Sequence, residues 1–245
     1  MKRSLDDGNI VHFYENAAGK YDTVRFLSYQ GCYTDLEQKG IVLSMIKNND
    51  IKRILDLGCG TGRFSVQLAN LGINVVAADP SFTMLKQVEL KDVTHKINLV
   101  NANGYTLPFK DNSFDACVCV NVINHVINYE DIIREINRIL YDDGFMVMNF
   151  ANSMGFYLPV SLYVNSFHKS LQENIYTKWF NYFEIKNILA DCGFEINEIM
   201  GFIVFPRRTI PEWSFKFLKE LDQYCRNTVL KYLSGSLFIK AQKIS

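Results

Sequence analysis

Three glycines separated by single residues follow a short apolar segment, and this pattern constrains the fold of the chain more than any other. Residues 54–62 read Ile-Leu-Asp-Leu-Gly-Cys-Gly-Thr-Gly. An apolar run, a glycine-rich turn and an amphipathic segment, in that order, predict a strand, a tight turn and a helix. Glycine leaves no Cβ between the main chain and a bound molecule, and the first N–H groups of the helix point into the same space. The segment therefore predicts a site where a cofactor lies on the backbone.

The residue after the third glycine bears on which cofactor binds. Dinucleotide-binding turns follow the pattern G-x-G-x-x-G. Counted from Gly58, the sixth position here is Arg63, so this pattern fails by one residue. The chain carries D-x-G-x-G-x-G instead, beginning at Asp56. A pyrophosphate is an anion that helix N–H groups attract, whereas a cationic cofactor attracts a carboxylate.

The D-x-G-x-G-x-G segment resembles motif I of the class I S-adenosylmethionine (SAM) dependent methyltransferases. In that family the glycine turn holds the methionine end of SAM, which has an ammonium and a sulfonium group. The resemblance implies that Asp56 lies near the amino group. It also implies cofactor contacts from the residues of the turn, namely Gly58, Cys59, Gly60 and Gly62. An NAD-dependent oxidoreductase and a non-catalytic SAM-binding regulatory protein remain as alternatives.

A second carboxylate ends the next predicted strand, residues 74–79. Asp79 lies about 20 residues past the glycines, where this type of fold puts an acid on the ribose hydroxyls of the cofactor. Because SAM and NAD both have an adenosine ribose, this acid does not separate them. Pro80 and Met84, which follow it, are further predicted cofactor contacts.

Two later segments resemble parts of the same family. Residues 102–109, Ala-Asn-Gly-Tyr-Thr-Leu-Pro-Phe, are similar to a family segment G-D-A-x-x-L-P-F, whose Asp takes the adenine amino group. The resemblance implies Ala102, Asn103 and Gly104 as cofactor contacts, with the Asn103 carbonyl accepting from that amino group. Asn121 follows the next apolar run, where the family brings the chain beside the cofactor.

Methyl transfer in this family is an in-line displacement at the methyl carbon, so the protein mainly supplies alignment. Alignment contributes ~7–11 kcal/mol in favourable cases. A hydroxyl acceptor usually also needs a general base. His125 is the candidate base because its place after the fourth strand faces the methyl group. Weaker candidates are Tyr14, Tyr33 and His168.

Four segments are expected to wall the crevice beyond the carboxyl ends of the strands, and all but 121–128 are rich in Tyr, Phe or Trp. These segments are 1–50, 121–128, 152–180 and 202–213. We expect an aromatic-rich lid over a bulky, partly apolar small-molecule acceptor.

Several polar residues refine the expected ligands. Lead-in helices often cover the cofactor in this family, which implies that Tyr21 and Arg25 contact its carboxylate end. Arg207 and Arg208 are candidate contacts for an acidic acceptor. Methyltransferases that modify base amino groups carry an N-P-P-Y type motif at the fourth strand, whereas residues 121–124 read Asn-Val-Ile-Asn. This difference weighs against a nucleobase acceptor.

Charge and cysteine content favour a cytoplasmic enzyme. The chain has 26 Lys and Arg against 26 Asp and Glu, which provides no broad attraction for nucleic acid. We therefore expect no nucleic-acid partner. The opening residues show no apolar segment typical of a secretory signal. The six cysteines lack C-x-x-C spacing. We expect Cys117 and Cys119 to be buried structural thiols, and expect no metal site.

One uncharged run, residues 144–167, is long enough to cross a bilayer. Polar residues such as Asn149 and Asn152, together with Pro159, interrupt it. We expect a buried strand over 145–150, followed by an apolar lid segment, and no membrane span.

From Arg53 onward, strands and helices alternate, which predicts an α/β fold with a Rossmann-like, doubly wound, mostly parallel sheet. One helix is expected to begin at an Asn128 cap and to stop at residues 142–144, Asp-Asp-Gly. Another is expected to begin with a capping box at Asn181 and Glu184 and to end at Gly193.

A single domain over residues 1–245 is expected. It comprises a helical lead-in over 1–50, a cofactor-binding core over 51–151, and lid insertions over 152–180 and 202–230. Residues 237–241 read as a last strand, which the family resemblance implies is antiparallel to its neighbours.

Overall fold

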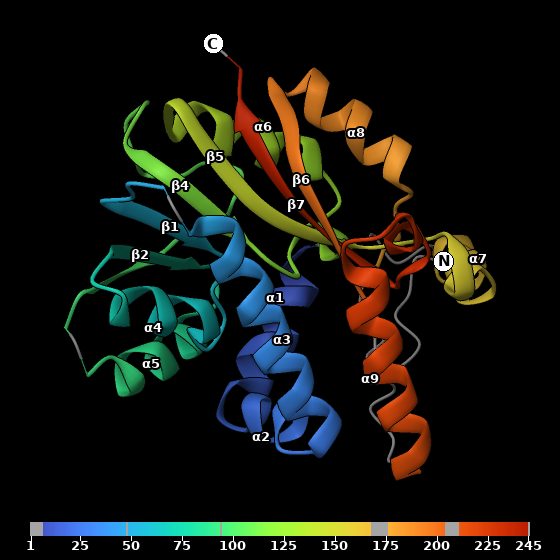
Figure 1. The fold of residues 1–245 in the computed structure, drawn as a ribbon. Helices are drawn as coiled ribbons and strands as arrows, with labels where there is room; N and C mark the ends of the chain where they lie inside the picture. The colour runs from blue at the N-terminus through green and yellow to red at the C-terminus, as the bar shows by residue number, and fades with distance from the viewer. Residues whose placement is uncertain (1–6, 48, 94, 168–175, 204–210, 245) are drawn as a thin grey trace, which may run out of the picture.

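A central β-sheet organises the molecule (Figure 1). The computed structural model describes residues 7–47, 49–93, 95–167, 176–203 and 211–244. Within these residues, seven strands form one sheet in the order β3-β2-β1-β4-β5-β7-β6. The strands are β1 (Arg53–Leu57), β2 (Asn74–Asp79), β3 (Ile97–Asn101), β4 (Phe114–Cys119), β5 (Leu140–Ala151), β6 (Phe194–Phe202) and β7 (Ser236–Lys243).

The sheet is mixed, and its direction changes only near one edge. Strands β1 to β5 pair in parallel, whereas β7 runs antiparallel between β5 and β6. This confirms the predicted doubly wound sheet with an antiparallel last strand. The strand order reverses between β1 and β4, and such a reversal opens a crevice at the carboxyl ends of the strands.

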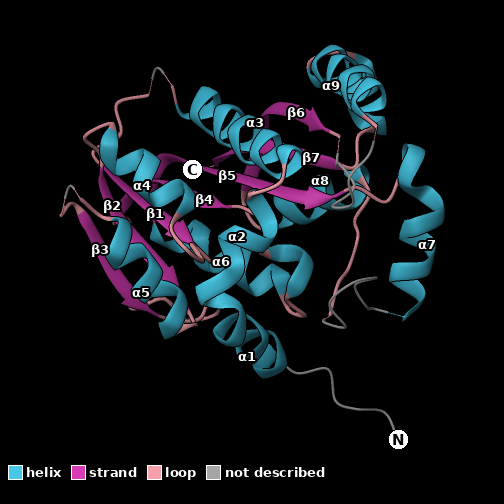
Figure 2. Cartoon of the chain, turned by 90° about the horizontal axis from the view of Figure 1, so that it is seen from below, coloured by secondary structure: helices cyan, strands magenta, loops and turns pink. Residues whose placement is uncertain are grey.

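Helices cover both faces of the sheet. Figure 1 shows α6 and α8 on one face, and Figure 2 shows α2, α3, α4 and α5 in front of the other. The helices are α1 (Asp7–Ala17), α2 (Tyr21–Phe26), α3 (Tyr29–Ile46), α4 (Arg63–Asn70), α5 (Phe82–Lys91), α6 (Tyr129–Ile139), α7 (Leu158–Phe167), α8 (Tyr182–Asp191) and α9 (Glu212–Arg226). Short 3-10 turns are η1 (Ala18–Lys20), η2 (Ile123–His125), η3 (Gly155–Tyr157) and η4 (Val229–Leu233).

Alternation along the central strands divides their side chains between two cores. On β4, Cys117 and Cys119 pack in the core that includes the isoleucines of α6, whereas Ala116 and Val118 pack with residues of α3 and α4. Both thiols are free and fully buried, as the sequence predicted.

The connection from α6 to β5 differs from the expectation. The helix ends at Ile139 rather than at residues 142–144 because Leu140 already pairs with Phe114 in the sheet. The next paired residue of β5 is Phe145, opposite Ala116, so residues 141–144 form a bulge. Asn128 precedes the helix, but its side chain makes no capping hydrogen bond.

Helix α8 begins as expected, but only one of the two contacts of the predicted capping box is present. The Asn181 side chain accepts a hydrogen bond from the Glu184 N–H at 2.8 Å. The Glu184 carboxylate binds Lys178 at 2.7 Å instead of returning to the cap. Gly193 follows the helix with φ +79°, a left-handed conformation that ends helices.

The uncharged run 144–167 divides between β5 and α7, which confirms the predicted strand over 145–150. None of the helices in the described ranges is long and apolar enough to cross a bilayer.

Candidate active site

The glycine turn after β1 is held in left-handed backbone conformations. The φ angles of Gly58, Gly60 and Gly62 are +66°, +53° and +80°. A Cβ on Gly58 would overlap with the Val122 side chain, and one on Gly62 would lie 2.9 Å from Val88. A Cβ on Gly60 would meet no atom within 4 Å. Packing thus requires the first and third glycines, whereas the second faces open space.

That open space is a cavity at the carboxyl ends of β1, β2 and β4, which we call the cofactor cavity. Helix α1 contributes Ile10 and Tyr14 to its wall. The predicted site residues that line it are Tyr21, Gly58, Cys59, Gly60, Asp79, Pro80, Met84, Asn121 and His125. Gly62 lies beside it, as the N-cap of α4.

Asp79 is held rigidly in this cavity. Its Oδ2 accepts from the Gly60 N–H at 2.9 Å and its Oδ1 accepts from the Ser81 N–H at 2.8 Å. Burial raises the pKa of the carboxyl, and these two hydrogen bonds oppose the rise. Each carboxylate oxygen keeps a further lone pair, so the group can still accept from two hydroxyls.

Asp56, which the motif resemblance implied to lie near the amino group of the cofactor, lies inside the protein. Its carboxylate is fully buried and accepts from Ser65 Oγ at 2.5 Å, within the first turns of α4. Strand alternation directs it to the same face as Ile54, toward α4, and it does not line the cofactor cavity. Burial raises its pKa to about 6. Asp56 therefore links the end of β1 to the start of α4.

The loop after β3 also lies outside the cofactor cavity. The side-chain oxygen of Asn103, Oδ1, accepts hydrogen bonds from the N–H groups of Tyr105 and Thr106, at 3.1 and 3.2 Å. It borders a shallow neighbouring hollow together with Ala102 and Pro80. A Cβ on Gly104 would lie 3.1 Å from Ile132 of α6, so packing accounts for this glycine. The oxygen expected to bind adenine already has two backbone donors.

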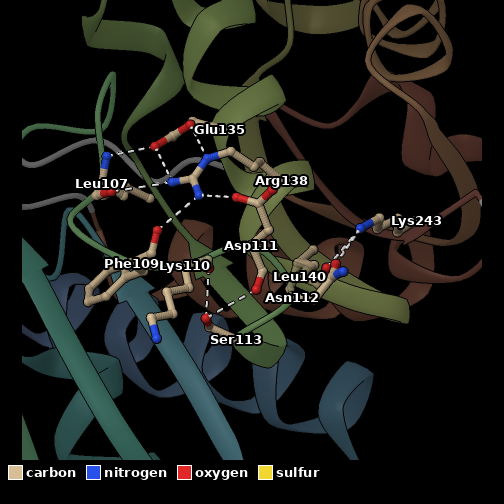
Figure 3. A network of polar contacts seen from close by, with 10 residues as sticks. All are labelled: Leu107, Phe109, Lys110, Asp111, Asn112, Ser113, Glu135, Arg138, Leu140 and Lys243. Atoms are coloured by element: carbon tan, nitrogen blue, oxygen red, sulfur yellow. Dashed lines mark hydrogen bonds and ion pairs between the residues drawn. The ribbon is translucent and has the colours of Figure 1, made fainter.

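A polar network fixes this loop on α6 (Figure 3). Arg138 donates to the carboxylates of Glu135 and Asp111 at 2.7 and 2.6 Å, and to the Phe109 carbonyl at 2.9 Å. The Leu107 N–H donates to Glu135 at 2.7 Å. The hydrogen bond from Arg138 lowers the pKa of Glu135. Sequence inspection missed these contacts.

Asn121 stands at the centre of the site in a left-handed conformation, with φ +60°. Its N–H donates to Asn149 Oδ1 at 2.6 Å, and Asn149 Nδ2 returns a bond to Asn121 Oδ1 at 3.0 Å. Asn149 also donates to Ser236 Oγ at 3.1 Å, so β5 and β7 together hold Asn121 in place. A polar residue within the apolar run of β5 was the only sequence signal for Asn149.

A second cavity adjoins the first and shares Tyr14, Tyr21, Arg63, Asn121 and His125 with it. Its further wall comes from α3, from the ends of β5 to β7 and from residues 177–179. It contains the predicted cofactor contact Arg25, whose guanidinium lies 4.9 Å from the Tyr21 ring centre.

His125 lies in the walls of both cavities. Its Nδ1 is 3.1 Å from the Tyr176 carbonyl oxygen. A carbonyl only accepts hydrogen bonds, so this contact places the proton of a neutral ring on Nδ1 and makes Nε2 the basic nitrogen. The ring of Tyr14 is 6.5 Å away, measured between centroids.

Backbone pairing presents residues 177–179 to the second cavity. The Lys178 N–H donates to the Asn124 carbonyl at 2.8 Å. The Asn165 side chain of α7 bonds both the N–H and the carbonyl of Trp179, at 2.8 and 2.9 Å. Within the expected lid over 152–180, Thr177 and Trp179 line the second cavity. Helix α7 holds this segment through Asn165.

The lead-in helices are anchored to the glycine turn by charged groups. Asp22 of α2 accepts from Thr61 Oγ1 at 2.6 Å and pairs with Lys91. Arg63 pairs with Asp35 of α3 at 2.7 Å and lies 4.0 Å from the Phe26 ring centre. Arg63, which departs from the dinucleotide-binding pattern, thus fixes α2 and α3 beside the glycine turn.

The weaker candidate bases are not all placed near the cavities. Tyr33 donates to the buried Asp222 at 3.2 Å and lines neither cavity, and burial raises its pKa. Tyr14 lines both cavities. His168, Arg207 and Arg208 lie outside the described residues.

Comparisons with known proteins show what the chain is similar to. The family of methyltransferase domains matches residues 55–148. An uncharacterised protein of Methanocaldococcus jannaschii is 37% identical over 144 residues, which are 58% of this chain and 52% of that protein. A ubiquinone biosynthesis O-methyltransferase of Rickettsia canadensis is 30% identical over 164 residues, 63% of this chain and 68% of that protein. Other relatives are named as O-methyltransferases and as C-methyltransferases.

A solved structure shares the fold. The crystal structure of a SAM-dependent methyltransferase from Thermotoga maritima has a TM-score of 0.69 and 19% identity, and the match covers 95% of this chain and 99% of that one. The chain spans about half the length of the two archaeal relatives that it matches. By its motif, fold and relatives, this chain belongs to the SAM-dependent methyltransferases of class I fold.

Proposed function

We propose that this chain transfers a methyl group from SAM to a bulky, partly apolar small molecule, at oxygen or nitrogen. The observation that carries the proposal is the meeting of the two cavities at Asn121 and His125. One cavity suits a nucleoside cofactor, and the other, lined by Phe26, Trp179 and Phe202, suits an apolar acceptor.

The residues of the cofactor cavity fit SAM. The bare backbone at Gly60 leaves room for direct contact, and Asp79 is oriented to accept from the two ribose hydroxyls. Met84 and Pro80 supply apolar surface beside it for the adenine ring. Arg25 and Tyr21 are proposed to bind the carboxylate end of the cofactor.

When bound, SAM supplies a methyl group on a positively charged sulfur, which makes the methyl carbon electrophilic. The protein then has to align the acceptor atom with this carbon and exclude water. We assign the proton of a hydroxyl acceptor to Nε2 of His125, because the Tyr176 carbonyl keeps the hydrogen of the neutral ring on Nδ1. An amine acceptor would use its own lone pair and release its proton afterwards.

The acceptor atom and compartment are part of the proposal. The relatives include enzymes named for transfer to oxygen and to carbon, and the choice of oxygen or nitrogen rests on His125 at the junction of the cavities. A cytoplasmic location remains a prediction from the free cysteines.

The test combines binding and turnover. Calorimetry with SAM, with its demethylated product S-adenosylhomocysteine (SAH) and with NAD should show binding of the first two only. Radiolabelled SAM incubated with a metabolite extract should then yield a labelled small molecule that mass spectrometry can identify. Binding of NAD without SAH would overturn the cofactor assignment. Binding of SAH without transfer to any acceptor would favour the regulatory alternative.

A further inference from the structure

The inward face of α3 is polar where it borders the second cavity. Gln30, Thr34 and Gln38 follow one another at intervals of four residues and all line this cavity. Gln30 and Gln38 are only 6% and 7% exposed. A helix normally turns apolar residues inward, as α3 itself does further along with Ile41 and Met45. The polar residues at its beginning therefore call for polar partners.

Gln38 has such a partner in the protein, whereas Gln30 has none among the described residues. The side-chain oxygen of Gln38, Oε1, accepts a hydrogen bond from Arg63 at 3.2 Å. No hydrogen bond joins the Gln30 side chain to another residue in the described ranges. Two side-chain atoms in these ranges, Arg226 Nε and Ser234 Oγ, are fully enclosed by protein and lack a hydrogen-bond partner. No atom of Gln30 is among them. The Gln30 amide is thus not sealed in protein and opens onto the second cavity.

The charges of the second cavity indicate what this amide meets. Among the described residues that line it, none is Asp or Glu. Of its two arginines, Arg63 is paired with Asp35 at 2.7 Å, and Arg25 is the one proposed above to bind the carboxylate end of the cofactor. A wall with amide and hydroxyl donors, such as Gln30 and Thr34, and without carboxylates favours an oxygen that accepts hydrogen bonds and disfavours an ammonium group. Phe26, Trp179 and Phe202 in the same wall favour a flat apolar body behind that oxygen.

We propose that Gln30 recognises the head of the methyl acceptor, which is a carbonyl-type oxygen of a carboxamide or carboxylate on a flat apolar body. The Gln30 Nε2 donates to this oxygen while the opposite end of the acceptor faces His125. The inference rests on the proposed function, because it takes the second cavity as the acceptor site. Gln30 thus sets which acceptors bind and takes no part in the displacement.

Benzamide, benzoate and toluene test this assignment because they share a ring and differ in the head. Their binding to the SAH-loaded protein is measured by ligand-observed NMR for the wild type, Gln30→Leu and the control Gln223→Leu on the exposed side of α9. We expect Gln30→Leu to weaken benzamide and benzoate at least tenfold and to leave toluene within twofold. Gln223→Leu should match the wild type.

Stability separates recognition from a structural role. A buried amide without a protein partner stabilises nothing, so Gln30→Leu should melt at the same temperature as the wild type or higher. Gln30→Glu is a second variant that keeps the shape but loses the donors, and it should reject benzoate. A lower melting temperature of Gln30→Leu with unchanged binding of the three probes would show a structural residue.

Equal affinity of benzamide for the wild type and Gln30→Leu, or no benzamide binding to the wild type, would also overturn the proposal. Calorimetry with SAH on the same samples distinguishes the two levels of failure. If the wild type did not bind SAH, the proposed function would be refuted. If it bound SAH but Gln30→Leu bound the three probes like the wild type, only the assignment of Gln30 would be refuted.

Discussion

The floor of the cofactor cavity contains the glycine turn, whereas the wall of the second cavity is assembled from residues of distant segments. Gly58, Gly60 and the carboxyl end of β2 line the first cavity from two short segments, and α1, α5 and the loop after β4 add side chains to it. Amide and aromatic side chains from α3, from residues 177–179 and from the ends of β5 to β7 form the second. A site built on backbone needs glycines at fixed places, which leave a pattern in the sequence. A site built on side chains from distant segments leaves none.

This contrast implies that the two cavities respond differently to substitution. A change on the floor of the first should alter cofactor affinity whatever the acceptor. A change at the junction or in the second cavity should alter turnover or acceptor binding with cofactor affinity intact.

The largest effect is expected for His125→Ala, at the junction of the cavities. Loss of a general base should slow turnover of a hydroxyl acceptor about 100-fold or more, with SAH affinity unchanged. Initial rates and calorimetry measure the two quantities. His12→Ala, on the exposed side of α1, is the matched control and should behave as wild type. Undiminished turnover of His125→Ala would remove this residue from the chemistry.

Gly60→Ala should weaken SAH about 30-fold, because the added methyl group occupies ligand space. Gly72→Ala provides a close control, since Gly72 also has a left-handed φ, +86°, and open space around its missing Cβ. Both variants should lose about 1–2 kcal/mol of unfolding free energy in urea. Equal SAH affinity of the two variants would contradict the position assigned to the cofactor.

Asp79→Ala should weaken SAM and SAH by about tenfold or more, because hydrogen bonds to a charged group are lost. Asp115→Ala is its control. Asp115 also accepts from two backbone N–H groups, those of Lys52 and Arg53 at 2.9 and 2.8 Å, but it lines neither of the two cavities. Titration calorimetry of both variants isolates the effect on the ribose. Unchanged affinity of Asp79→Ala would exclude the carboxylate from the site.

The smallest effect on affinity, less than threefold, is expected for Asp56→Asn, because the buried Asp56 does not line the cofactor cavity. Its effect on stability should depend on pH. The folded-state pKa of about 6 lies above the ordinary 3.8, so the carboxyl stabilises the fold at low pH and loses this contribution as pH rises through 6.

The asparagine variant should therefore gain about 2 kcal/mol relative to the wild type between pH 4 and pH 7.5. Urea unfolding at both pH values measures this difference. A more than tenfold loss of SAH affinity would instead support the contact with the amino group that the motif implied.

The sequence predicted well what depends on neighbouring residues. The strand–turn–helix around Gly60, the position of Asp79 at the end of its strand and the place of Asn121 after the fourth strand all follow from local spacing. The antiparallel last strand came from the family resemblance.

What the sequence did not show depends on contacts between distant residues or on fine geometry. Arg138 binds Asp111, 27 residues away, and Asn149 binds Asn121, 28 residues away. For Asp56 and Asn103, the sequence did not show the hydrogen bonds that their side chains make inside the protein, to Ser65 of α4 and to the N–H groups of Tyr105 and Thr106. Their contacts with the cofactor stay predictions. The end of α6 was misplaced because pairing of Leu140 in the sheet prevails over the stop signal at 142–144.

The hydrogen bond from Asn149 to Ser236 has a consequence for biosynthesis. Asn149 leaves the ribosome 87 residues before its partner, and β7, which carries Ser236, fills the gap between two strands that are translated earlier. A nascent chain that ends before β7 holds Asn121 with one support fewer, beside an incomplete sheet. Gly235 and Ser236 line the second cavity, whereas every residue that lines the cofactor cavity is translated before β5. The second cavity should therefore be completed late in translation, after the segments of the cofactor cavity have left the ribosome.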